Sequence, residues 1–232
     1  MGGWLELTTE ERRFLDGLES RSVSFRRRAM LANEGDEVES AYVVKQGWVA
    51  TSTDLADGSR QLRRLHVPAD IAGMPGLAMR HHAENIVALT DVVVSPFGKD
   101  AVRSLFASFP RLSAMMFAIS QIERVSLGDR LSCVGRLSAK ARIAFVLLDI
   151  LHRLRGVDRS IGSTFVLHIT REEMADITGI TPIHVSRKWS ELAREGLVAR
   201  AGQQVTLLDE ARLLSLSGYV NRMGDLDLSC LP

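Results

Sequence analysis

A short segment in the last quarter of the chain carries polar and basic side chains whose types and spacing suit contacts with DNA. Thr181 is a good helix-capping residue, and Pro182 fits the first helical position, so a helix is predicted to begin there. If Val185 and Leu192 face inward, the opposite face of this helix is polar. The candidate DNA-contacting residues are Thr181, Pro182, Ile183, His184, Ser186, Arg187, Lys188, Ser190 and Arg194.

These side chains are expected to make two kinds of contact, some to base edges and some to backbone phosphates. Arg187 lies one turn into the predicted helix, where a guanidinium can make a bidentate contact to guanine O6 and N7. His184 and Ser186 could reach bases or phosphates. Lys188 and Arg194 would neutralise backbone phosphates, which contribute affinity without sequence preference.

The residues upstream predict a helix and a turn that would position this segment. Thr170 and Glu173 have the spacing of a capping box, which opens a helix. Ala175 is small enough for two helices to cross closely, and Gly179, four residues on, can end the first helix in the left-handed conformation. Val185 follows six residues after Gly179. This order of small residue, glycine and apolar residue indicates a helix-turn-helix.

A predicted wing follows the second helix. Ala201-Gly202 suits a tight turn, and residues 205–207 (Val-Thr-Leu) suit a strand, so a two-stranded wing is expected. The alternative is an ordinary helical hairpin whose charged side chains are only solvated.

The first half of the chain predicts a β-rich domain. Thr8 and Glu11 suit a capped helix, and short apolar, β-branched pieces then recur between turn signals, which is typical of a roll or barrel. The expected strands are 22–25, 42–44, 48–51, 61–67, 86–89 and 92–95.

After Pro96 the period becomes helical. A short helix is expected over 99–106, then a longer one from Pro110, and a third that begins at Ser138 and ends near Leu154. The long helix has an apolar stripe, and a second copy of the chain would bury it economically. The alternative is that it packs only on its own β domain. Its stripe comprises Leu112, Met115, Met116, Ile119, Ile122, Val125, Leu131 and Val134.

The totals exclude several classes of protein. The 232 residues carry a net charge of +1 and only two cysteines, Cys133 and Cys230, which form neither a disulfide framework nor a metal motif. No signal peptide and no run of about 20 apolar residues is present, so we expect a cytoplasmic protein with no membrane partner. A metal-dependent cupin enzyme would need histidines on the strands, and residues 35–60 contain none. We therefore expect no enzyme activity, no metal and no cofactor.

Residues 169–198 resemble the DNA-binding domain of the Crp/Fnr family of bacterial regulators, especially the branch with a Thr-Pro-x-His-Val-x-Arg recognition helix. The upstream chain matches that family's cyclic-nucleotide-binding type of β-roll, and residues 134–139 resemble its hinge. The resemblance covers about residues 20–212. The matching β-roll residues are Gly35-Asp36, Tyr42-Val43-Val44, Gly47, Val49 and Asp70-Ile71-Ala72-Gly73.

This resemblance implies an α+β fold with an N-terminal, jelly-roll-like β-roll, a long dimerisation helix and a C-terminal winged helix-turn-helix. It also implies a homodimer that binds double-stranded DNA at a palindromic operator, regulates transcription and has RNA polymerase as a further partner. The predicted divisions are a sensor-like domain over 1–110, the dimerisation helix over 111–136, the DNA-binding domain over 137–216 and a tail over 217–232.

The chain departs from the family where its cyclic-AMP-binding members hold the nucleotide. Those members have Gly-Glu and then an Arg-Ser or Arg-Thr pair, whereas this chain has Gly73-Met74 and Ala83-Glu84-Asn85. A thioether is only a weak acceptor of a hydrogen bond from a ribose hydroxyl, and a carboxylate repels a phosphate. The resemblance therefore implies a β-roll kept as architecture and not gated by cyclic AMP.

Other effectors remain alternatives: another small molecule, haem through His81 or His82, or redox state through Cys133. Two adjacent histidines on a polar loop are more often solvated, and a lone cysteine is more often a small buried hydrophobe. The N-terminal cysteine cluster of the family's iron–sulfur members is absent. In the recognition helix, Ile183 replaces a glutamate found in many members and could meet a thymine methyl.

Overall fold

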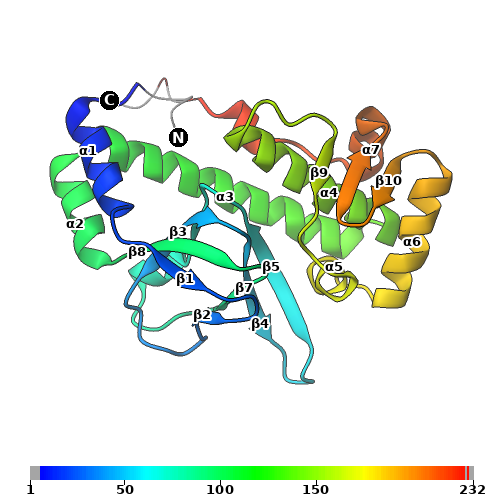
Figure 1. The fold of residues 1–232 in the computed structure, drawn as a ribbon, viewed down its shortest axis with the longest axis horizontal. Coiled ribbons are helices and arrows are strands. Elements are labelled where there is room, and N and C mark those ends of the chain that lie inside the picture. The colour runs from blue at the N-terminus through cyan, green and yellow to red at the C-terminus, as the bar shows by residue number, and fades with distance from the viewer. Residues whose placement is uncertain (1–5, 228, 230–232) are drawn as a thin grey trace. The chain divides into compact units, whose positions relative to one another are not determined.

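The computed structural model describes residues 6–227 and 229, which divide into two compact units between Met115 and Met116 (Figure 1). Each unit is described by itself. Residues 1–5, 228 and 230–232 lie outside the described residues, and with them Cys230 and the last part of the predicted tail.

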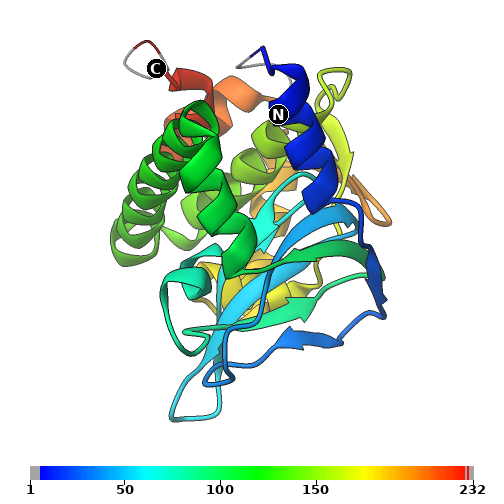
Figure 2. The ribbon, with the colours of Figure 1, turned by 90° about the vertical axis from the view of Figure 1, so that its left-hand side faces the viewer.

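The N-terminal unit is a β-roll of two four-stranded sheets, ordered β1-β8-β3-β6 and β2-β7-β4-β5. Its core lies between them, because the buried apolar residues come from both: Val44 and Val94 from one sheet, Val49 and Ile86 from the other. Figure 2 shows these strands in its lower part, with the blue helix α1 at one end. The strands are β1 (Val23–Phe25), β2 (Met30–Ala32), β3 (Ala41–Gln46), β4 (Val49–Asp54), β5 (Arg60–His66), β6 (Ile71–Ala72), β7 (Asn85–Ala88) and β8 (Val92–Phe97).

Local signals explain several of these elements. The predicted capping box opens α1 (Thr9–Leu18): the Glu11 amide donates to Thr8 Oγ1 at 3.2 Å and the Thr8 amide donates to Glu11 Oε2 at 2.8 Å. Gly47 turns the chain between β3 and β4 at φ +79°, and a Cβ there would collide with the Asp91 carbonyl oxygen. Only glycine fits that turn.

The helices after the roll begin where the sequence predicts. α2 spans Lys99–Ser108 and α3 spans Pro110–Arg136 without a break. The predicted apolar stripe of α3 has two different environments. Leu112 and Met115 are buried, whereas Val125 and Leu131 are exposed.

The C-terminal unit is built around α4 (Ala139–Val157), whose cap is Ser138 as predicted. The apolar side chains of α4 are among the most buried in the described residues. Arg155 connects this helix to α7 (Glu210–Ser217) through two 2.7 Å hydrogen bonds to Glu210. The remaining elements are β9 (Thr164–Val166), α5 (Arg171–Thr178), α6 (Pro182–Arg194), β10 (Val198–Ala201), β11 (Gln204–Leu207), α7 (Glu210–Ser217) and the 3-10 turn η2 (Arg222–Asp225).

The wing is a three-stranded sheet of order β10-β11-β9, so the predicted hairpin gains a third strand that sequence analysis missed. The segment after α7, for which no element was predicted, is also ordered against its own unit. Tyr219 is buried, with its ring edge-on to Phe145 at 5.1 Å and stacked on His152 at 5.3 Å.

In the described part of the chain, no single helix has the length and apolar character to cross a membrane; α2 and α3 meet those requirements only as a pair, bent by 119°.

Candidate nucleic-acid interface

Helix α5 begins and ends at the capping residues from which it was predicted. The Glu173 amide donates to Thr170 Oγ1 at 3.1 Å, and the Thr170 amide donates to Glu173 Oε2 at 2.7 Å, which completes the capping box. At the other end Gly179 adopts φ +65°, and its amide donates to the Ala175 carbonyl at 2.9 Å. The chain can therefore reverse into α6 within three residues.

Helix α6 begins at its predicted cap. The His184 amide donates to Thr181 Oγ1 at 3.3 Å, and Pro182 occupies the first helical position, where its missing N–H removes no hydrogen bond. Val185 and Leu192 are buried, so the rest of the helix surface faces outward. This geometry is the helix-turn-helix that the spacing predicted.

The structure gathers the nine candidate residues on this one helix and its cap. Ser186 and Lys188 are half-buried, and the other seven are exposed: Thr181, Pro182, Ile183, His184, Arg187, Ser190 and Arg194. Ile183 is 68% exposed, which is unusual for an isoleucine and leaves its methyl groups free to meet a ligand.

Arg187 and Lys188 differ in whether their side chains already have a hydrogen-bond partner within the protein. The Arg187 side chain makes no hydrogen bond or ion pair with any residue that the structure describes, so its guanidinium is available to a ligand. Lys188 Nζ instead donates to both carboxylate oxygens of Glu191, at 2.8 and 3.0 Å. A phosphate contact by Lys188 would have to displace Glu191 or share Nζ with it.

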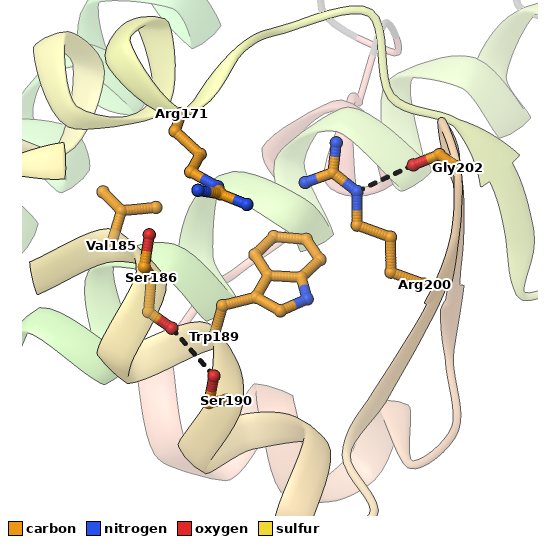
Figure 3. A pocket seen from close by; sticks show the side chains of 7 residues that line it. All are labelled: Arg171, Val185, Ser186, Trp189, Ser190, Arg200 and Gly202. Atoms are coloured by element: carbon orange, nitrogen blue, oxygen red, sulfur yellow. Dashed lines mark hydrogen bonds between the residues drawn. The ribbon is translucent and has the colours of Figure 1, made fainter. Parts of the chain in front are cut away.

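A pocket of about 350 Å³ lies beside this helix, between the start of α5, the middle of α6 and the turn of the wing (Figure 3). Sequence analysis missed three of the residues that line it: Arg171, Trp189 and Arg200. A usable signal existed for the two arginines, since Arg171 directly follows the Thr170 cap and Arg200 lies two residues before the predicted Gly202 turn. The pocket is lined by Arg171, Val185, Ser186, Trp189, Ser190, Arg200 and Gly202.

In the β-roll, the segment that replaces the nucleotide-binding residues already holds a carboxylate. Glu84 is half-buried and accepts a hydrogen bond from Thr51 near Arg63 and Arg64. Burial raises the pKa of Glu84, and this outweighs the hydrogen bond and the two arginines, which lower it. The Arg63 side chain donates to Thr53 Oγ1 at 3.2 Å and to the Ala83 carbonyl at 3.4 Å.

The alternative sensor residues lie in two environments. His81 is exposed, as predicted, but the interpretation of both histidines as solvated is wrong for His82. His82 is buried near Gly76, and burial lowers the pKa of its ring. The Cys133 thiol is buried, and desolvation raises its pKa to about 11. Within the described residues, no cluster of three or more His, Cys, Asp or Glu side chains is arranged to hold a metal ion.

Comparison with known proteins matches both units. Residues 22–109 match the cyclic nucleotide-binding domain family, and residues 141–216 match the Crp-like helix-turn-helix domain family. The transcriptional activator protein FnrL of Cereibacter sphaeroides is 31% identical over 188 residues, which are 79% of this chain and 75% of that protein. The transcriptional regulatory protein btr of Bordetella pertussis is 28% identical over 204 residues, covering 88% of this chain and 84% of that protein.

Solved structures have a similar fold over most of this chain. The structure of FixK2 from Bradyrhizobium japonicum superposes with a TM-score of 0.78 at 25% identity, and the match covers 86% of this chain and 98% of FixK2. The structure of CooA from Carboxydothermus hydrogenoformans has a TM-score of 0.67 at 19% identity and shares the fold. The β-roll, the long helix and the capped helix-turn-helix thus occur in the same order as in these proteins, and the chain belongs to the Crp/Fnr family of transcription regulators.

Proposed function

We propose that this protein is a homodimeric, sequence-specific regulator of transcription that places α6 in the major groove of a palindromic operator. The observation that carries the proposal is Arg187, exposed and without an intramolecular partner among the described residues, one turn into α6. A guanidinium in that position can read guanine through O6 and N7. The other eight candidate residues on α6 and its cap would add base and phosphate contacts.

The proposed dimer forms along residues 111–136. On α3, Phe117, Val125, Leu127 and Leu131 are 62%, 48%, 58% and 75% exposed, and such side chains are stabilised when a second copy covers them. Two glycines on this helix, Gly128 and Gly135, have open space around them, so a partner helix could approach closely.

A two-fold dimer would present two α6 helices about 34 Å apart, which matches half-sites one helical turn apart. In this arrangement residues 1–110 form the sensor-like domain, 137–216 the DNA-binding domain and 217–232 the tail. DNA in the cytoplasm and RNA polymerase are the proposed partners, and regulation rather than catalysis is the proposed role.

The β-roll is proposed to act without cyclic AMP. A buried cyclic phosphate needs a cation and several donors that are free to receive it. Here the Glu84 carboxylate already lies beside Arg63 and Arg64, and Arg63 donates to Thr53 and Ala83. A second anion at this site would meet a like charge and arginines that already have partners.

Selection of bound duplexes from a random-sequence pool by the purified protein, without added nucleotide, tests the proposal directly. The expected result is an enriched palindrome whose half-sites are one helical turn apart, bound by one dimer as measured by light scattering with DNA present. Recovery of no enriched sequence, or a monomer at micromolar concentration on the enriched DNA, would contradict it.

A further inference from the structure

The pocket beside α6 combines two cationic side chains with an aromatic one. Arg171 enters it from the start of α5 and Arg200 from the wing, and Figure 3 shows their guanidinium groups on either side of the Trp189 ring. Both arginines are exposed, and neither forms an ion pair with a carboxylate of the described residues. The pocket is therefore positively charged and open to an anion.

Arg200 is held in place, whereas a wing arginine would ordinarily be free to rotate. Its guanidinium carbon lies 5.2 Å from the centre of the Trp189 ring, within the range of a cation–π interaction. Its Nε donates to the Gly202 carbonyl at 2.9 Å, which leaves the two terminal nitrogens toward the pocket (Figure 3). A side chain fixed before binding loses less conformational entropy when it binds.

We propose that Trp189 is a positioning residue for Arg200, and that Arg200 and Arg171 together bind one phosphate of the DNA backbone in this pocket. This inference rests on the proposed function and adds to it a contact outside the base-reading face of α6. Trp189 itself does not read bases. It orients the wing guanidinium so that both arginines face the same phosphate, which fixes the register of α6 along the groove.

Salt titrations of binding to a random-sequence duplex measure this contact, because each neutralised phosphate contributes about 0.9 to the slope of log K against log salt. If Arg171 and Arg200 share one phosphate, each single variant, R171A or R200A, should keep part of the contact because the other arginine still binds that phosphate. The double variant should then lower the slope by about 0.9 in total. A fall of about 1.8 would mean two separate phosphates and would overturn the shared site.

The role of Trp189 is tested by W189L and W189F. W189L should weaken duplex binding roughly threefold, as expected for loss of an exposed cation–π contact, and should add nothing further in an R200A background. W189F keeps an aromatic face and should largely restore affinity. R13A, which removes an exposed charge on α1, is the matched control and should leave the slope unchanged.

Three outcomes separate the possibilities. Full affinity in W189L, or additive losses in W189L/R200A, would overturn the positioning role, and thermal melts of W189F guard against a folding defect. If millimolar inorganic phosphate at constant ionic strength changes the tryptophan fluorescence of the wild type saturably, but the R171A/R200A double variant keeps the wild-type salt slope for duplex binding, the pocket is a site for free phosphate and the DNA assignment is overturned. If the wild type binds no duplex, the proposed function fails as well, whereas unchanged binding by the pocket variants of a DNA-binding wild type overturns only this inference.

Discussion

Arg222 and Asp129 form a two-point ion pair, with Nε and Nη2 donating to the two carboxylate oxygens at 2.7 and 3.0 Å. The pair joins the segment after α7 to the last third of α3, 93 residues earlier in the chain. Together with buried Tyr219, it holds residues 218–225 against the same unit. This segment thus supports the helix that is proposed to form the dimer.

Replacing Arg222 by Gln should loosen this segment without unfolding the unit, because the ion pair is only half-buried and lies outside the apolar core of α4. Amides of residues 218–225 should exchange faster with solvent, and D129N should have the same effect. The double variant should exchange no faster than either single variant, since both remove one interaction. Native-state hydrogen exchange measures this, and unchanged exchange in both single variants would contradict it.

Arg187→Ala should weaken operator binding by on the order of 1–3 kcal/mol and relax preference at one base pair of each half-site, because a bidentate base contact is lost. Lys188→Ala should weaken binding to all sequences alike and flatten the salt dependence. The ion pair of Lys188 with Glu191 predicts that this second effect is small. Footprinting and binding titrations on the selected operator check both, and an unaltered sequence preference in Arg187→Ala would contradict the placement of α6.

Elements with strong local signals were predictable from sequence. The capping residues Thr8, Thr170 and Thr181 and the turn glycine Gly179 fix chain geometry within a few residues, so the helix-turn-helix and its outward face followed from spacing alone. Six of the strands also lie where alternation and turns placed them.

The missed features depend on distant partners. β6 has two residues, too few to show alternation, and β2 pairs with β7 through an irregular register. Trp189 has the sequence pattern of an ordinary helix residue, and its contact with Arg200 depends on how the wing folds back. The burial of His82 likewise comes from the chain around Gly76, which sequence spacing does not reveal.

Cys133 should be unreactive in the folded protein. With a thiol pKa of about 11, roughly one molecule in a thousand carries the thiolate at about pH 8, and the thiolate is the reactive form. In a Cys230→Ser background, iodoacetamide should label Cys133 slowly in buffer and rapidly in denaturant. Rapid labelling of the native protein would restore the redox-sensor alternative.

Glu84→Gln should alter how stability depends on pH. The unfolded carboxyl has a pKa near 4.5 and the folded one a pKa above it, so between these values the folded state binds more protons than the unfolded chain. The free energy of unfolding therefore falls as pH rises through that window. The amide that replaces the carboxyl has no proton to lose, so this loss of stability should be absent in the variant. Urea melts at several values between about pH 4 and pH 7 measure the difference, and parallel pH profiles would contradict it.

From the Glu84 carboxylate we predict that the protein binds neither cyclic AMP nor cyclic GMP at micromolar levels. We therefore expect it to bind its operator without either nucleotide. Glu84 and Met74 supply an anion and an apolar group at the sequence positions where a cyclic phosphate and its ribose need a cation and an acceptor. Calorimetric titration of each nucleotide into the purified dimer, with and without operator DNA, is the direct check, and heats of dilution alone are expected. Saturable heat with a Kd below roughly 10 µM, which corresponds to about −6.8 kcal/mol, would show that the pocket accepts a second anion despite Glu84. Glu84→Ala provides the matched comparison: if like-charge repulsion is the barrier, this variant should bind the nucleotides more tightly than the wild type does.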